Sequence, residues 1–346
     1  MDKKLYDILV KQFKKYPKME ICDAVKLVYQ AEFGGGHRVN DEYDCIQKIE
    51  DEGSNLTADQ LTEPYYTEIG GGWCRMNFSV LGALPVVVFA RMFMESTKYC
   101  SGTQRGFEER IVVLRRIAEE KRAGFTSEAL NKYLLEYRKG GIRPVSHSRA
   151  YTESYAPAYR VVKKEYCKFL DAFIKISRLY SLGNEVTVAI DGQSGAGKTT
   201  LASTIASVFD CNIFNTADFM AVNRRGSLVF DAGRFKTEVC EKLNRGEPFS
   251  YGVCDPETGR VTSQKTVEPK RLNIIEGAYS LHHSLRKYYE LKIFMEVNPI
   301  LQSKRILEDY GEEGFRRLNT DIIPRENEYF EQSGIRLKSD LVFNIK

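Results

Sequence analysis

The residues whose types and spacing carry the clearest chemistry lie between positions 192 and 199, where the chain reads GQSGAGKT. The segment fits the phosphate-binding pattern G-x-x-x-x-G-K-[S/T] without a gap, an apolar run (186–190) precedes it, and a helix-compatible run (200–208) follows it. Glycines let backbone N–H groups turn toward a phosphate, and the helix N-terminus adds partial positive charge. A chance match in a glycine-rich turn is the alternative, and the flanking strand and helix patterns argue against it. The sequence therefore predicts a site for a nucleoside triphosphate.

Residues of this loop and of a later helix are expected to contact the nucleotide, which we take to be ATP with Mg²⁺. Lys198 is expected to reach the β- and γ-phosphates and to act in catalysis, and Thr199 is expected to bind Mg²⁺. The residues predicted to bind the nucleotide are Gly192, Ser194, Gly195, Ala196, Gly197, Lys198, Thr199, Thr200, Lys304 and Arg305.

Two carboxylates follow predicted strands in the same half of the chain. Glu276 comes directly after the apolar run 272–275, and the neighbouring phosphate loop favours a Mg²⁺ ligand over an ordinary solvated acid at this strand end. Asp218 follows the run 212–214 and is suited to accept the proton of a substrate hydroxyl. A turn or capping aspartate is the alternative for Asp218, and the sequence alone leaves the two interpretations even.

Positive charge near the transferred group comes from late in the chain. Arg316 and Arg317 follow an acidic, glycine-containing segment (309–314), and we expect this segment to close over the triphosphate and exclude water, with both arginines acting in catalysis. Solvated helix charges are the alternative for any single arginine. A phosphate loop, metal ligands, a proton acceptor and a lid together indicate phosphoryl transfer.

The elements that must position these side chains begin near residue 181. From there to residue 346, short apolar runs alternate with helical patterns, and the runs lie at 186–190, 212–214, 272–275, 291–297 and 341–345. This alternation predicts an α/β domain with a parallel sheet and helices on both faces. Ligands of such sheets bind beyond the carboxyl ends of the strands, and every candidate above lies at or after such an end.

Residues 1–180 are predicted to form a separate, mostly α-helical domain that shapes substrate choice or regulates the second domain. Glycine-rich or aromatic segments interrupt the helical pattern near 33–37, 70–77 and 143–147. Such interruptions are costly inside packed helices, which favours a polar pocket at these places.

Five polar residues near these interruptions are candidates for binding an anionic or hydroxyl-rich ligand. They are His37, Arg75, Asn77, His147 and Arg160. For each of them alone, a structural role in a turn or in the core is the alternative. A nucleophile formed by Cys74 with His37 or His147 has no support from the spacing.

Composition limits the cellular setting and the partners. The chain has 346 residues, enough for two domains, and a net charge of only +4 with basic and acidic residues interleaved, so no nucleic-acid-binding arm is expected. Eight scattered cysteines without metal-ligand spacing indicate reduced thiols. The longest apolar stretch (80–90) is too short to span a bilayer, and the N-terminus has no apolar signal core. We expect a cytoplasmic protein that acts on a small-molecule hydroxyl substrate, without nucleic acid or membrane, and homo-oligomer formation stays open.

Several motifs resemble, in order, the uridine kinase and phosphoribulokinase family of P-loop kinases. They are GQSGAGKT (192–199), ADF (217–219), FDAGRF (230–235), SYGVCDPETG (250–259), IIEGAYSLH (274–282) and RRLNTDIIPRENEYFEQSGIRLKSDLVF (316–343). The resemblance covers about residues 184–346. It implies a nucleoside-monophosphate-kinase-like fold and transfer of the γ-phosphate of ATP to a hydroxyl group, with a nucleoside-like (uridine-kinase-like) acceptor favoured.

The same resemblance implies roles for single residues. Asp218 takes the general-base position, and Glu276 is the acid at the strand end. Asp231 takes the position that grips substrate hydroxyls, Arg234 belongs to the same substrate-binding motif, and Tyr251 falls where the substrate pocket has an aromatic ring. Two other functions stay open: a nucleotide-dependent regulatory switch, and a bifunctional enzyme with a second site in residues 1–180.

Overall fold

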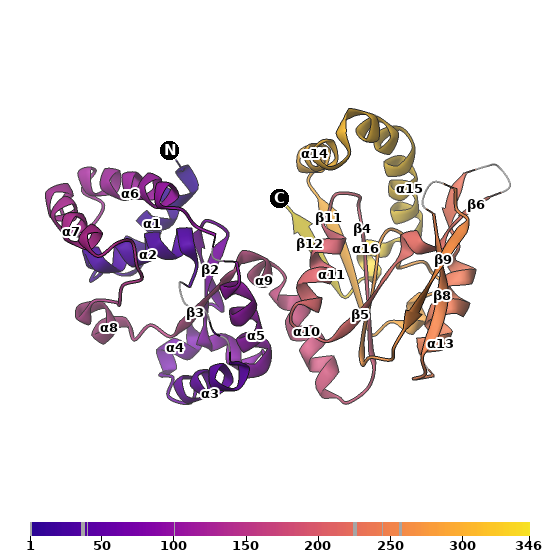
Figure 1. Cartoon of the computed structure of the whole chain (residues 1–346), viewed down its shortest axis with the longest axis horizontal. Helices are drawn as coiled ribbons and strands as arrows, with labels where there is room; N and C mark the ends of the chain where they lie inside the picture. The colour runs from indigo at the N-terminus through magenta and orange to yellow at the C-terminus, as the bar shows by residue number, and fades with distance from the viewer. Residues whose placement is uncertain are drawn as a thin grey trace. The chain divides into compact units, whose positions relative to one another are not determined.

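The computed structural model describes residues 2–35, 39, 41–99, 101–223, 227–243, 245–255 and 258–346. The chain divides into two compact units, Met1–Leu170 and Asp171–Lys346 (Figure 1). The division falls at the start of helix α10 (Leu170–Ser181), a segment that the sequence analysis assigned to the first domain.

The N-terminal unit is mostly helical, as predicted. Four of its helices share one core, in which residues such as Leu5, Leu9, Phe107 and Leu114 are fully buried at helical spacing. The helices are α1 (Lys3–Lys15), α2 (Ile21–Phe33), α3 (Glu42–Gly53), α4 (Ala58–Thr62), α5 (Val86–Thr97), α6 (Gln104–Glu119), α7 (Ser127–Lys139), α8 (Arg149–Tyr155) and α9 (Lys164–Lys168), and α1, α2, α6 and α7 enclose that core.

The same unit contains a three-stranded antiparallel sheet that the sequence analysis did not predict. Its strands, β1 (Tyr66–Gly70), β2 (Trp73–Asn77) and β3 (Tyr159–Lys163), lie in the order β1-β2-β3. The glycine run 70–72 is therefore the turn of a hairpin and not an interruption between helices. Gly71 has a φ of +61°, and a Cβ there would lie 1.6 Å from the carbonyl oxygen of Ala31, so the turn requires glycine.

The C-terminal unit is built on the parallel sheet that the sequence predicts. Five strands lie in the order β12-β11-β4-β10-β5, and every neighbouring pair is parallel. Their bounds are β4 (Val186–Gly192), β5 (Cys211–Asn215), β10 (Leu272–Glu276), β11 (Leu291–Val297) and β12 (Leu341–Ile345). The three central strands are almost entirely buried, as expected for a sheet covered on both faces.

Helices and two antiparallel hairpins surround this sheet (Figure 1). The helices are α10, α11 (Lys198–Ala206), α12 (Ala232–Phe235), α13 (Glu241–Leu243), α14 (Pro299–Arg317), α15 (Ile323–Ser333) and α16 (Ile335–Lys338). The hairpins pair β6 (Met220–Val222) with β7 (Leu228–Phe230), and β8 (Phe249–Cys254) with β9 (Val261–Val267). The predicted fold class, an α/β kinase-like unit preceded by a helical region, is confirmed.

The register of the central strands decides where the site forms. Glu276, the last residue of β10, lies opposite Ile190 of β4 on one side and Asn215 of β5 on the other. The carboxyl ends of these strands therefore meet at one edge, directly before the glycine loop. Among the described residues, no helix combines the length and apolar character needed to cross a membrane.

Candidate active site

The glycine loop joins β4 to α11 in the strand–loop–helix arrangement that phosphate binding requires. Gly192, Gly195 and Gly197 all have positive φ, at +146°, +75° and +91°. A Cβ at Gly192 would lie 2.2 Å from the carbonyl oxygen of Met295 on the neighbouring strand, so glycine is required there. Gly197 immediately precedes α11, whose free N–H groups therefore face the loop.

Side chains from α14 and α15 hold this loop. Glu326 of α15 is 3% exposed and accepts hydrogen bonds from Ser194 N (3.0 Å) and Ser194 Oγ (2.8 Å). On α14, Gln302 Nε2 donates to the Ser194 carbonyl oxygen (2.8 Å), and Arg305 Nη1 donates to that of Gly195 (2.7 Å). Of the two predicted cations on this helix, Arg305 contacts the loop, while Lys304 faces solvent and pairs with Glu308.

Lys198 folds back over the loop. Its Nζ donates to the carbonyl oxygens of Gly192 (2.7 Å) and Gln193 (3.1 Å). These are the same kind of oxygen acceptors that a phosphate group supplies, so the ammonium group lies at the loop and can exchange these partners for phosphate oxygens.

A buried carboxylate and a hydroxyl meet beneath the loop. Thr199 Oγ1 donates to Glu276 Oε1 (3.1 Å), and Asn215 Nδ2 donates to the same oxygen (2.8 Å). Glu276 is 2% exposed, and burial raises the pKa of its carboxyl group. The structure thus joins the two predicted metal ligands, and their oxygen atoms suit Mg²⁺. No cluster of three or more His, Cys, Asp or Glu side chains with metal-site geometry occurs in the described part of the chain, so phosphate and water would complete the coordination.

Asp191 is a residue of this site that the sequence reasoning missed. It is completely buried and accepts hydrogen bonds from Gly192 N (2.8 Å), Leu281 N (2.9 Å) and the Tyr329 hydroxyl (3.1 Å). Burial raises the pKa of Asp191 to about 6, although Lys198 acts in the opposite direction. Its carboxylate therefore links the start of the loop, by hydrogen bonds, to the turn that follows β10 and to α15. An acid inside an otherwise apolar run was the available signal.

Asp218 lies on a short 3₁₀ helix, Thr216–Phe219, directly after β5. The hydroxyl of Tyr251 on β8 donates to Asp218 Oδ2 (3.0 Å). Two predicted site residues that are 33 positions apart in the sequence are therefore in contact. The charge of Asp218 contributes to the raised pKa of Glu276. Asn215, which directly precedes this 3₁₀ helix, donates to Glu276, so the segment that carries Asp218 starts at the predicted metal ligand.

Arg234 uses its donors inside the protein. Its guanidinium donates to Cys254 Sγ (2.8 Å) and to the carbonyl oxygens of Asp218 (3.0 Å) and Gly252, and it pairs with Glu238 at 3.0 Å. These contacts lock the Asp218 segment to β8. Asp231 caps α12 by accepting a hydrogen bond from Arg234 N (2.9 Å) through Oδ1.

The predicted lid arginines lie at the end of α14. Arg316 and Arg317 are both exposed, and neither has an ion-pair partner within the described segments. Gly311 interrupts the helix with non-helical angles (φ 66°, ψ −172°), so the last turns, which carry both arginines, form a separate short segment.

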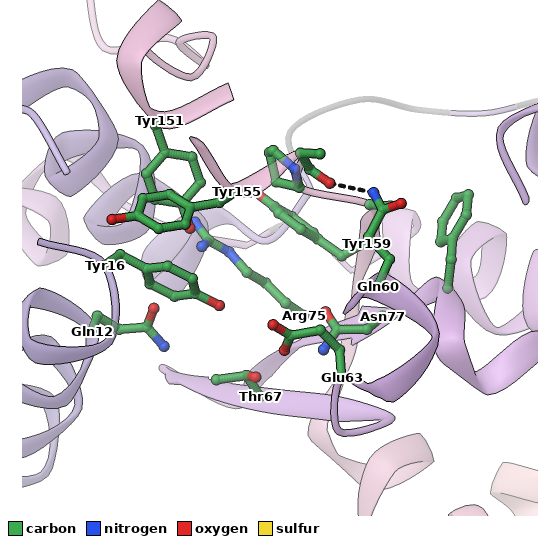
Figure 2. A pocket seen from close by; sticks show the side chains of 14 residues that line it. Gln12, Tyr16, Gln60, Glu63, Thr67, Arg75, Asn77, Tyr151, Tyr155 and Tyr159 are labelled. Carbon is green, nitrogen blue, oxygen red and sulfur yellow. Dashed lines mark hydrogen bonds between the residues drawn. The ribbon is translucent and has the colours of Figure 1, made fainter. Parts of the chain in front are cut away.

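The candidate residues of the N-terminal unit line two hollows and not one. Arg75 and Asn77 line a small cavity walled by the rings of Tyr16, Tyr151, Tyr155 and Tyr159, which we call the tyrosine cavity (Figure 2). His147 and Arg160 line a wider hollow together with Lys26, Arg143 and Tyr159, which we call the basic cleft. Tyr159 separates the two.

The remaining N-terminal predictions concern histidine and cysteine. His37 lies outside the described residues. Cys74 is 1% exposed on β2. A cysteine buried in this way lacks the exposed, electropositive surroundings of a reactive thiolate.

The fold and the loop together define the C-terminal unit as a P-loop α/β protein. No protein-family model matches the chain. The chain is 27% identical over 129 residues to uridine-cytidine kinase C of Dictyostelium discoideum, a match that covers 35% of this chain and 29% of that protein. The resemblance to uridine kinases predicted from the motifs is confirmed by this match, which spans less than a third of the relative's length.

A solved structure is also similar. It is that of a protein from Bacillus stearothermophilus described as a possible uridine kinase, with 18% identity, a TM-score of 0.36, and coverage of 50% of this chain and 99% of that chain.

Proposed function

We propose that this protein is an ATP-dependent kinase that transfers the γ-phosphate to a hydroxyl group of a small, nucleoside-like molecule. One observation carries the proposal: Thr199 and Asn215 both donate hydrogen bonds to the buried carboxylate of Glu276, which supports a magnesium site between the glycine loop and the segment that carries Asp218. The similarity to a uridine-cytidine kinase supports the nucleoside-like acceptor.

The loop and its supports bind and orient the donor. Backbone N–H groups of the loop and of the first turn of α11 surround the phosphates, and Lys198 exchanges the carbonyl oxygens of Gly192 and Gln193 for phosphate oxygens. Thr199 and Glu276 fit a magnesium ion, which when bound neutralises charge on the β- and γ-phosphates. Arg305 keeps the loop in shape through Gly195.

Asp218 acts on the acceptor. Tyr251 occupies Oδ2, while Oδ1 has no hydrogen-bond donor among the described residues and is free to accept the proton of the attacking hydroxyl. The contacts of Arg234 with the Asp218 carbonyl and β8 hold this carboxylate in position. Asp231, whose Oδ2 is not used in capping α12, binds a second hydroxyl of the acceptor. The exposed Arg316 and Arg317 close over the triphosphate.

The test uses the full chain with ATP, Mg²⁺ and separate nucleosides, sugars and polyols, and it detects phosphorylated products by mass spectrometry. We expect one class of hydroxyl compound, with nucleosides favoured, to gain a phosphate. Lys198→Ala should abolish the product, whereas Lys338→Ala removes an equal charge from the surface and should not. Formation of only ADP and free phosphate across the whole panel contradicts the proposal and supports a nucleotide-dependent switch.

A further inference from the structure

Only one of the two hollows in the N-terminal unit has room for a metabolite. The tyrosine cavity encloses about 40 Å³, whereas the basic cleft offers about 700 Å³. Small-molecule sites in proteins occupy about 300–1,000 Å³. Tyrosine rings wall the tyrosine cavity (Figure 2), but the basic cleft is the one with the volume of a ligand site.

The described side chains that line the basic cleft carry an excess of positive charge. Lys26, Arg143 and Arg160 face it, and Glu52 is the one carboxylate among the described lining residues. Glu52 is already neutralised, because Arg160 Nη1 and Nη2 donate to its two oxygens at 3.0 and 2.7 Å. Lys26 and Arg143 therefore have no carboxylate left to pair with among the described lining residues.

Lys26 is the central cation of the cleft. Its Nζ donates to the carbonyl oxygen of Val145 (2.7 Å), and within the described residues it has no ion-pair partner. Burial, and then the charge of Arg75, lower the pKa of Lys26, so its ammonium group lies in surroundings that disfavour further positive charge. An anion at this place would relieve both effects.

Arg75, which lines the neighbouring tyrosine cavity, adds a further positive charge near the cleft. It is 4% exposed, stacks over the ring of Tyr159 at 4.5 Å, and donates through Nε (2.9 Å) and Nη2 (2.8 Å) to Gln30 Oε1. Gln30 is neutral, and no carboxylate pairs with Arg75 in the described part of the chain. A guanidinium group cannot lose its proton. The positive charge of Arg75 therefore acts on the cleft residues Lys26 and His147 and lowers the pKa of both.

A chain of hydrogen bonds through Asp23, His147 and Tyr159 holds the imidazole ring of His147 in the wall of the cleft. His147 Nδ1 is 2.8 Å from Asp23 Oδ1, and its Nε2 is 2.7 Å from the Tyr159 hydroxyl. Burial and the charges of Arg75 and Lys26 lower the pKa of His147 despite the opposing effect of Asp23. The neutral ring donates from Nδ1 to Asp23 and accepts from Tyr159. The Asp23 carboxylate is thus hydrogen-bonded to His147 and Ser148, and although its charge acts to raise the pKa of Lys26, burial and the charge of Arg75 outweigh it.

We propose that the basic cleft is a binding site for a small organic anion, held by Lys26 and Arg143 through a phosphate or carboxylate group and packed against the rings of Tyr29 and Phe93. The site lies wholly within Met1–Leu170 and is independent of the kinase function proposed for the other unit. The wall is preorganised, because Tyr159, His147 and Gln30 are already fixed by one another.

The test is isothermal titration calorimetry on the full chain at constant ionic strength, with pyrophosphate and citrate as two separate probes. Lys198→Ala serves as the background, so that the phosphate loop contributes little to the pyrophosphate signal. Lys26→Gln and Arg143→Gln should each weaken binding of at least one probe by about tenfold or more, since each removes a charged hydrogen bond. Lys11→Gln, which removes an exposed charge of α1, should leave the affinity unchanged.

The two probes distinguish the sources of the anion. Binding of pyrophosphate alone indicates a phosphorylated ligand, and binding of citrate alone indicates a carboxylic acid. The ring of the single tryptophan, Trp73, packs against Gly34, and the next residue, Gly35, lines the cleft. A change in tryptophan emission therefore locates the binding in this unit. Arg143 is exposed and its variant should fold normally. Binding of neither probe, or equal binding by the Lys26→Gln, Arg143→Gln and Lys11→Gln proteins, overturns the proposal.

Discussion

Replacing Asp191 by asparagine should alter how the stability of the C-terminal unit depends on pH. Burial raises the pKa of Asp191 from an ordinary value of 3.8 to about 6. Between about pH 4 and about pH 6 the native state therefore binds more protons than the unfolded state. The contribution of Asp191 to the free energy of unfolding consequently falls as the pH rises through this range and is constant above it.

The magnitude follows from the shift. A pKa shift of about 2 units changes the free energy of unfolding by about 3 kcal/mol over the whole titration. About 1.4 kcal/mol of this change takes place between about pH 5 and about pH 7.5. Asparagine does not titrate. Because its amide group has only one oxygen, one of the three groups that donate hydrogen bonds to Asp191 loses its acceptor. That loss costs about 1–3 kcal/mol and is the same at both pH values. The stability advantage of the wild type over the variant should therefore shrink by about 1.4 kcal/mol.

Hydrogen exchange of the β4 segment, followed by mass spectrometry, measures the opening free energy of this unit separately from the N-terminal unit. We expect the difference between the wild type and Asp191→Asn to decrease as the pH rises. Asp309→Asn, on the exposed part of α14, should show no such change. A difference that stays constant, or that grows with pH, refutes the argument that burial dominates the ionisation of Asp191.

Three further outcomes are expected. Asp218→Asn should lower kcat by about two to four orders of magnitude while leaving the ATP affinity unchanged, because only the proton acceptor is lost; kinetics and calorimetry measure the two quantities. Glu276→Gln should raise the Mg²⁺ concentration needed for half-maximal activity by about 10- to 100-fold, as a magnesium titration would show, and EDTA should abolish activity of the wild type. Gly192→Ala should destabilise the loop by about 1–3 kcal/mol and lower the melting temperature, because the added Cβ meets the Met295 carbonyl at 2.2 Å.

Each of these outcomes has a result that contradicts it. Equal losses of turnover and ATP affinity in Asp218→Asn would assign that carboxylate to nucleotide binding. An unchanged magnesium requirement in Glu276→Gln would exclude it as a metal ligand. An unchanged melting temperature in Gly192→Ala would mean that β11 can shift away from the added Cβ without loss of stability.

The sequence predicts the C-terminal fold well because its signals are local. Each central strand is an apolar run of strand length, and the glycine loop marks the turn between β4 and α11. Thr199 and Glu276 are predictable as partners because Glu276 ends β10, and Thr199 lies in the first turn of the helix that follows β4, the neighbouring strand of the same parallel sheet.

The contacts that the sequence does not reveal depend on tertiary packing. Glu326 sits in a charged, amphipathic helix, and nothing in its neighbourhood indicates that it is buried against Ser194. The family resemblance predicts that Arg234 binds substrate, yet its guanidinium donates to the backbone carbonyl oxygens of Asp218 and Gly252, which the sequence does not reveal. In the N-terminal unit, the glycine run 70–72 was compatible with a break between helices, and only pairing with β3, almost 90 residues later, makes the sheet evident.

The carboxylate of Asp23 has a consequence for how the N-terminal unit is synthesised and folds. It is completely buried, and it accepts hydrogen bonds from both the backbone and the hydroxyl of Ser148, 125 positions further along the chain. Until the ribosome has released that later segment, packing of α2 would bury this carboxylate with only its local hydrogen bond from Glu20 N, which is unfavourable. The early helices therefore gain their full stability only once Ser148 can reach Asp23. An N-terminal fragment that ends before Ser148 should be less stable than the whole unit.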